Sequence, residues 1–116
     1  MIINSFENLT EINQERLSTP EFINKVNADF SSFSNNNIIV ILSSLVNLSK
    51  SELSEFLLMS NIHRQKGHSF VIVTNNIDID STPEELIVVP TLIEAKDIIE
   101  MEEMEHHHNR FYSGKK

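Results

Sequence analysis

A serine-rich tetrapeptide near the middle of the chain has the residue types of a regulatory phosphorylation site. Its residues, Ser49-Lys50-Ser51-Glu52, fit a helix-capping box, in which the first serine caps free backbone N–H groups and the glutamate reaches back. Ser51 would then lie in the first helical turn, where backbone N–H groups and the helix dipole favour an added phosphate. The simpler interpretation is that Ser49 caps the helix and Ser51 is a solvated first-turn residue.

A run of three histidines near the end of the chain, His106-His107-His108, has residue types that bind divalent metals. Glu102 and His106 stand four residues apart, which is the spacing that places two side chains on one face of a helix. Glu105 is a further candidate ligand. Because nothing in the sequence completes a coordination shell, we expect no preorganised metal site and no cofactor.

The composition argues against most catalytic chemistries. The chain has no cysteine and only two glycines, Gly67 and Gly114, so it lacks a thiol nucleophile, a zinc-thiolate site and a glycine-rich phosphate loop. The isolated His63 and His68 lack the adjacent nucleophile and third orienting group that a catalytic dyad needs. We therefore expect a protein that is not an enzyme.

The net charge and the hydropathy of the sequence argue against nucleic-acid and membrane partners. Nine basic and 17 acidic residues give a formal net charge of −8, which repels a nucleic-acid backbone. No segment approaches the roughly 18 to 20 apolar residues of a membrane helix, and the N-terminal residues lack the pattern of a signal peptide. We expect a soluble cytoplasmic protein without nucleic-acid or membrane partners, and its 116 residues are enough for one domain.

Buried strands alternate with amphipathic helices along the chain, which predicts an α/β fold with a mainly parallel central sheet of four to five strands. The expected strands are one or two within Ile2–Asn13, then Ile38–Leu42, Phe70–Val73 and Leu86–Val89. The expected helices begin at Ser18-Thr19-Pro20-Glu21, at Ser49 and at Thr91, with a short helical turn at Thr82–Glu85 and a polar loop at Ser31–Asn37. We expect a single domain over residues 1–108 and a flexible tail over residues 109–116.

Two sets of side chains have alternative interpretations. The apolar residues that fall outside the expected inner helix faces form either an exposed docking patch or ordinary packing in helices whose phase is misjudged: Met59, Ile62, Met101 and Met104. The carboxylates of the last helix form either a solubilising face or an electrostatic partner site: Glu100, Glu102, Glu103 and Glu105.

From Ile38 to Phe56 the chain resembles the STAS domain, which anti-sigma-factor antagonists and the cytoplasmic tails of sulphate transporters share. In that family a buried strand leads through a short connection into a D-S-S/T-G motif, which opens a helix and carries the regulatory phosphorylation. The strand Ile38–Leu42, a connection that contains Leu45, Val46 and Leu48, and the helix start at Ser49 follow in the same order here. Ser51 stands at the phosphorylated position, whereas Ser49 replaces the family's Asp and Glu52 replaces its Gly.

The resemblance implies a STAS-like fold and a regulatory or adaptor protein that acts by protein–protein binding, possessing no catalytic activity. The implied partner is an anti-sigma factor or a kinase-like protein that binds the unmodified form, and phosphorylation of Ser51 would act as the switch. The residues expected to contact that partner are Leu48, Ser49, Lys50, Ser51, Glu52 and Phe56.

The stretches Pro83–Leu86 and Val89–Ala95 also resemble small bacterial STAS-like proteins that are often labelled ribonuclease Z. A true ribonuclease Z is a larger metallo-β-lactamase with an HxHxDH zinc motif, which this sequence lacks. The alternative hypothesis is therefore an accessory subunit of an RNA-processing nuclease, docked through its acidic last helix and without activity of its own. The sequence leaves the identity of the partner and the oligomeric state open.

Overall fold

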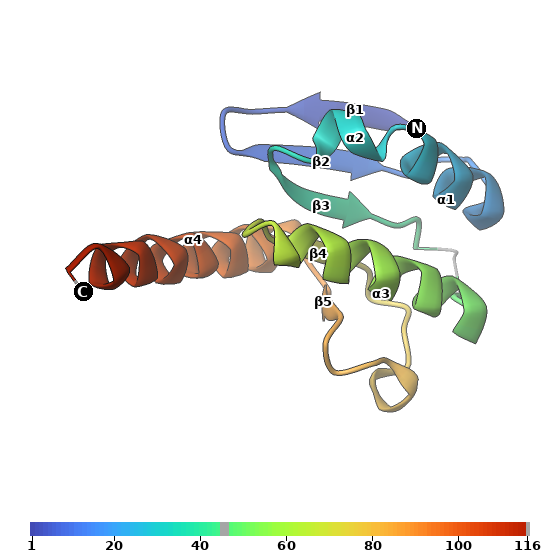
Figure 1. Ribbon diagram of the computed structural model, residues 1–116. Helices are drawn as coiled ribbons and strands as arrows, with labels where there is room; N and C mark the ends of the chain where they lie inside the picture. The colour runs from blue at the N-terminus through green and yellow to red at the C-terminus, as the bar shows by residue number, and fades with distance from the viewer. Residues whose placement is uncertain (45–46, 116) are drawn as a thin grey trace.

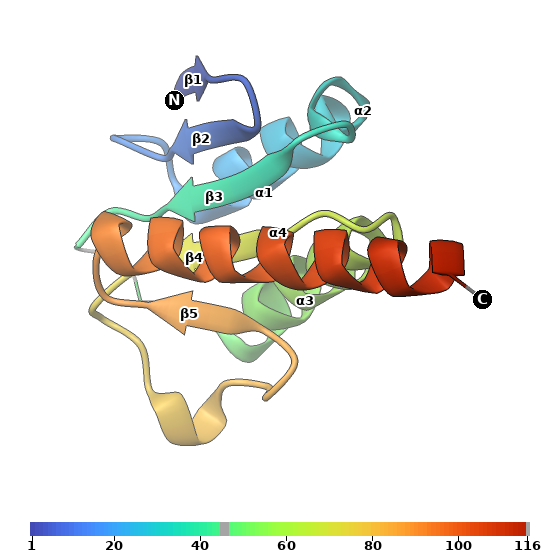
Figure 2. The same ribbon diagram turned by 90° about the vertical axis from the view of Figure 1, so that its left-hand side faces the viewer.

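A five-stranded, mostly parallel sheet lies at the centre of the fold. The computed structural model describes residues 1–44 and 47–115, with side chains except at residue 79 and residues 106–115. Within these residues the strand order is β1-β2-β3-β4-β5; β1 pairs antiparallel with β2, and the other pairs are parallel (Figures 1 and 2). The α/β fold and the mainly parallel sheet are thus confirmed. The strands are β1 (Ile2–Ser5), β2 (Leu9–Asn13), β3 (Asn37–Ile41), β4 (Phe70–Val73) and β5 (Ile87–Val89).

Burial along the strands follows their place in the sheet. All four residues of the inner strand β4 are buried, as are the first four of β3, because helices cover both faces of a parallel sheet. All four residues of the edge strand β1 are exposed. The unbroken apolar runs of β3 and β4 therefore mark inner strands, whereas the apolar run of β5 forms one edge of the sheet and the polar N-terminal segment forms the other.

The helices form one layer on each side of the sheet. The helices α1 (Thr19–Ala28), α2 (Phe30–Phe33) and α3 (Lys50–Gln65) share one apolar core with the sheet, in which Phe22, Phe33 and Phe56 are buried. On the opposite face α4 (Leu92–Lys115) contributes Ala95 and Ile99 to a second apolar core (Figure 2). The sheet is consequently the middle layer of three.

Side-chain caps at the helix starts agree with the sequence prediction. The Oγ atoms of Ser18, Ser49 and Thr91 accept hydrogen bonds from the backbone N–H three residues later. At its other end α3 stops at Gly67, whose φ of +85° lies in the left-handed region that glycine adopts at low cost.

The segment Ser31–Asn37 is not the polar loop that we predicted. A short helix, α2, continues through Phe33, and Asn37 is the first residue of β3. The reason is tertiary, because Phe33 is buried in the core and the side chain of Asn37 satisfies backbone groups of neighbouring segments. A polar-looking stretch thus holds two buried residues.

The predicted helical turn at Thr82–Glu85 is also wrong. A short 3₁₀ helix, η1, lies earlier, at Ile79–Ser81. Thr82 does not cap a helix, because its hydroxyl donates to the Asp78 carbonyl at 2.8 Å. A hydrogen bond of 3.1 Å from the Leu86 N–H to the Pro83 carbonyl closes an ordinary turn before β5.

The last helix extends farther than the sequence pattern indicated. α4 runs without interruption to Lys115 and projects past the end of the sheet (Figures 1 and 2). No change in the backbone marks residue 108, the expected end of the domain. The division into a domain and a flexible tail remains a prediction.

Candidate functional site at the start of α3

The start of α3 lies at the edge of the sheet where the parallel strands end. β2, β3, β4 and β5 run in the same direction, so their carboxyl ends meet at one edge, where α1, α3 and α4 begin. In open α/β sheets this edge is the usual place for binding sites. The connection that leads into α3 passes through Leu45 and Val46, which lie outside the described residues.

A buried glutamine holds this edge together. Gln14 is fully buried, and its Oε1 accepts a hydrogen bond of 3.0 Å from the Ser43 N–H, just after β3. Its Nε2 donates to the Leu17 carbonyl at 3.0 Å and to the Thr19 hydroxyl at 3.1 Å. Gln14 therefore fixes the start of α1 relative to the end of β3. This role could not be predicted, since a lone glutamine in a polar stretch has no distinguishing pattern.

The predicted capping box forms at the start of α3. The Glu52 N–H donates to Ser49 Oγ at 3.2 Å, and the Ser49 N–H donates to Glu52 Oε1 at 2.9 Å. Ser51 is exposed, and its Oγ lies 3.2 Å from Ser49 Oγ. The cap uses the hydroxyl of Ser49, so the hydroxyl of Ser51 is accessible and is not needed for the box.

A shallow depression separates the first turns of α1 and α3, which lie side by side. Its volume is about 250 Å³, and Ser49, Ser51, Glu52 and Glu55 line it from α3. Pro20, Ile23 and Asn24 line it from α1. Among the described residues that line it, the two glutamates carry the charge. The depression is therefore acidic before any modification.

The structure divides the predicted partner-binding residues into two groups. Ser49, Lys50 and Ser51 are exposed, and Leu48 and Glu52 are half-buried. Phe56 is fully buried in the apolar core, so its expected place on the partner surface is wrong. The reason is helix periodicity, because the side of α3 that carries Phe56 packs on the sheet. Phe56 positions the helix and does not present a contact surface.

The described contacts of Ser51 do not match those of an activated nucleophile. The partner of its hydroxyl is a second hydroxyl, whereas an activated serine needs a base that a third group orients. Among the residues whose side chains the structure describes, no three His, Asp or Glu side chains gather as a metal site. The triplet His106–His108 lies outside those side chains. In the described part of the chain, no helix combines the length and apolarity needed to cross a bilayer.

His63, an isolated histidine in the sequence, lies in the core with no exposed surface. Its Nε2 donates to the Asn36 carbonyl, and its ring lies edge-on to the rings of Phe30 and Phe70. Desolvation by burial lowers the pKa of His63, the hydrogen bond to Asn36 raises it, and the charges of His68 and Lys66 lower it further. The imidazole is therefore neutral at pH 7.

The predicted acidic face of α4 has mixed roles. Glu102 forms an ion pair with Arg64, and Glu103 Oε1 accepts hydrogen bonds from the side-chain amides of Asn8 and Asn37. Glu100 and Glu105 are exposed, as the solubilising face requires. Of the four predicted surface carboxylates, Glu102 thus joins α4 to α3 and Glu103 joins α4 to β3. Their partners lie far away in sequence, so the local charge pattern could not distinguish them.

The four apolar residues with two alternative interpretations also differ from one another. Met59 is buried in the core, so ordinary packing is the correct interpretation there. Ile62, Met101 and Met104 are 43%, 61% and 67% exposed. Because Ile62 belongs to α3 and the two methionines belong to α4, these three residues do not lie on one helix.

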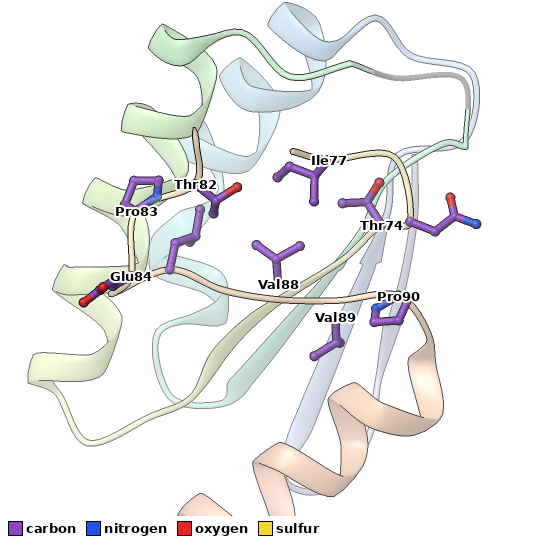
Figure 3. A pocket seen from close by; sticks show the side chains of 10 residues that line it. Thr74, Ile77, Thr82, Pro83, Glu84, Val88, Val89 and Pro90 are labelled. Atoms are coloured by element: carbon purple, nitrogen blue, oxygen red, sulfur yellow. The ribbon is translucent and has the colours of Figure 1, made fainter. Parts of the chain in front are cut away.

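A second cavity, of about 390 Å³, lies at the same edge of the sheet between β5 and the segment that leads into it (Figure 3). Ile77 and Val88 lie at its centre, and Pro83, Leu86 and Val89 are among its walls. The connection between β4 and β5 contains the short 3₁₀ helix η1 and no α-helix. The cavity lining is largely apolar and includes one carboxylate, that of Glu84, so the cavity can accept an apolar group.

Comparison with known proteins identifies no relative. No protein-family model matches the sequence, and no curated protein matches it at a significant level.

Proposed function

We propose that this chain is a STAS-like regulatory or adaptor protein that binds a protein partner at the start of α3 and is switched by phosphorylation of Ser51. The observation that carries the proposal is the accessible hydroxyl of Ser51, in a first helical turn whose capping box Ser49 already completes. A kinase can therefore modify Ser51 without breaking the cap.

The charges around Ser51 indicate the direction of the switch. A phosphate adds a charge of about −1.5 to −2 at pH 7. The depression beside Ser51 already contains Glu52 and Glu55, and the exposed Lys50 is the adjacent residue of opposite charge. Phosphorylation strengthens an existing acidic surface and so repels an acidic or apolar partner. The unmodified form is the form that binds.

The resemblance to STAS domains supplies the class of partner, an anti-sigma factor or a kinase-like protein. A non-enzymatic role agrees with the hydrogen bond of Ser51, whose partner among the described residues is a second hydroxyl and not a base. The protein would act by binding its partner in the unmodified form and releasing it once Ser51 is phosphorylated.

The test compares partner capture by the full chain and by matched variants. Cytosol of the source organism is passed over immobilised wild type, Ser51→Asp and Ser54→Asp, and bound proteins are identified by mass spectrometry. Ser54 is exposed on the same helix but does not line the depression, so it controls for added charge alone. We expect a kinase-like or anti-sigma protein that Ser51→Asp loses and Ser54→Asp retains.

A phosphorylation assay then examines the site itself. The captured partner is incubated with ATP and either wild type or Ser51→Ala, and phosphopeptides are mapped by mass spectrometry. We expect phosphate on Ser51 in the wild type and none on the variant. Equal phosphorylation of Ser51→Ala, or equal partner capture by wild type and Ser51→Asp, contradicts the proposal.

A further inference from the structure

A single helix covers the face of the sheet opposite to α1, α2 and α3. Five strands spaced about 4.8 Å apart span about 19 Å, whereas a helix with its side chains is about 10 Å wide. α4 contacts β3, β4 and β5. Within the described residues no helix lies over the β1–β2 half of this face (Figure 2). This layer of the fold is therefore incomplete.

A groove of about 630 Å³ runs between α4 and the start of β2. Asn8 and Leu9 line one side, and the other side is one flank of α4. That flank repeats at intervals of three and four residues, the spacing of a helix ridge against which another helix packs. Its members are Lys96, Ile99, Glu100, Glu103 and Met104.

The strand β1 extends the same surface. Asn4 is paired with Glu11, and Glu11 faces α4 because its carboxylate lies 3.5 Å from the Lys96 ammonium. Residues two apart in a strand point to the same side, so Ile2 also faces this side of the sheet. Ile2 is 45% exposed and Met104 is 67% exposed. Ile2 pairs with Asn13, at the end of β2 away from Leu9, so exposed apolar side chains lie at both ends of the uncovered surface beside α4.

The acidic charge of α4 indicates which kind of partner the groove would bind. Between Glu94 and Glu105 the helix has six carboxylates and one lysine, a local charge of 1 − 6 = −5. Lys96 pairs with Glu11, and Arg64 pairs with Glu102. Glu100 lines the groove and is exposed. An acidic surface attracts a basic partner and opposes a second copy of a chain whose net charge is −8.

We propose that the groove between α4 and the β1–β2 hairpin binds an amphipathic, basic helix of a different protein. Its apolar face would cover Met104 at one end and Ile2 at the other, and its flanking lysine or arginine residues would pair with Glu100. The bound helix would complete the layer that α4 covers only in part. This surface lies on the opposite side of the sheet from α3, so both surfaces can be occupied at once.

The test uses two designed peptides and the full chain. Both peptides have leucines at positions i, i+3, i+4 and i+7; one has lysines beside the leucines and the other has glutamates. Binding is measured by fluorescence anisotropy, and the methionine methyl signals of the chain are followed by NMR. We expect the lysine peptide to bind and to shift the Met104 methyl signal, and the glutamate peptide to remain free.

Matched variants assign the contact to the groove. Met101 and Met104 have similar exposure on the same helix, but only Met104 lines the groove. Met104→Ala should weaken binding of the lysine peptide about fivefold to tenfold, since it removes most of an apolar contact. Glu100→Gln should weaken it about twofold to fivefold at low salt. Met101→Ala and Asp97→Asn should leave the affinity within about twofold of wild type, because neither residue lines the groove.

Three results would overturn the inference. The first is absence of lysine-peptide binding to the folded chain. The second is equal binding of both peptides, or an equal loss of affinity in Met101→Ala and Met104→Ala. The third is self-association in sedimentation experiments that Met104→Ala abolishes, because the occupant would then be a second copy. Thermal unfolding of each variant confirms that the fold is intact.

Discussion

Arg64 at the end of α3 and Glu102 in α4 form a two-pronged ion pair that joins the two helical layers around the edge of the sheet. Arg64 Nη1 donates to Glu102 Oε1 at 3.2 Å, and Nη2 donates to Oε2 at 2.5 Å. The two side chains are 33% and 17% exposed, so water screens the pair only in part. The two helices belong to opposite faces of the sheet, and this pair connects them directly.

The ion pair between Arg64 and Glu102 should make a measurable contribution to the free energy of unfolding. We expect Arg64→Met and Glu102→Gln each to lower the free energy of unfolding by about 1 kcal/mol, because a bidentate pair that is partly shielded exceeds an ordinary surface ion pair. A double-mutant cycle by urea unfolding should give a coupling energy of about 0.5 to 1 kcal/mol. Additive losses in the double variant would show that the two residues act independently.

Asn37 should be the most sensitive polar position in the sheet. Its Oδ1 accepts from the Ser69 N–H at 2.8 Å, and its Nδ2 donates to the Asn8 carbonyl and to Glu103. Asn37→Ala leaves a buried backbone donor unsatisfied and should cost about 2 to 3 kcal/mol of unfolding free energy. The control Asn35→Ala, at an exposed position, should change it by less than about 0.5 kcal/mol. If urea unfolding showed that the two variants lose similar amounts of unfolding free energy, the proposed role of Asn37 would be refuted.

His63 should make the fold sensitive to mild acid. Burial lowers the pKa of His63 below its ordinary value of 6.5, so below that pH the unfolded chain binds a proton that the folded chain excludes. The stabilising effect of the neutral ring is complete above about pH 6.5 and declines as the pH falls toward the folded-state pKa. Unfolding free energies from pH 8 to pH 5 should therefore fall toward acid.

Matched variants separate His63 from the other titrating groups. The groups that face its ring are His68, Lys66, Phe30 and Phe70. In His63→Gln the decline between about pH 6.5 and pH 5 should be smaller than in wild type, while His68→Gln should retain most of it. An unchanged pH profile in His63→Gln would assign the acid sensitivity to other residues.

The two serines at the start of α3 should respond differently to substitution. Ser49→Ala removes the acceptor of the Glu52 N–H and should lower the unfolding free energy by about 1 kcal/mol. Ser51→Ala removes only a hydroxyl contact at an exposed position and should change it by less than about 0.5 kcal/mol. Thermal unfolding of both variants measures the difference. A large loss in Ser51→Ala would mean that Ser51 has a structural role.

Local patterns were sufficient for the strands β3 and β4 and for the cap of α3. They failed where distant contacts decide the structure. The side chain of Phe33 continues a helix into a polar stretch, and Thr82 donates to Asp78 when it was expected to cap a helix. The candidate site was predicted in part, since Ser49 and Ser51 lie as the capping box requires, but Phe56 faces the core.

The sequence by itself determined the class of the fold, because apolar runs and caps depend on neighbouring residues and on fixed periods of strand and helix. Only the tertiary structure decided the roles of Gln14, His63 and Glu103, whose partners come from other segments of the chain. The tertiary structure also decided that α4 is the single described helix on its face of the sheet, which leaves the groove beside β2 open. Such pairings depend on how the layers meet in space, and no local period encodes them.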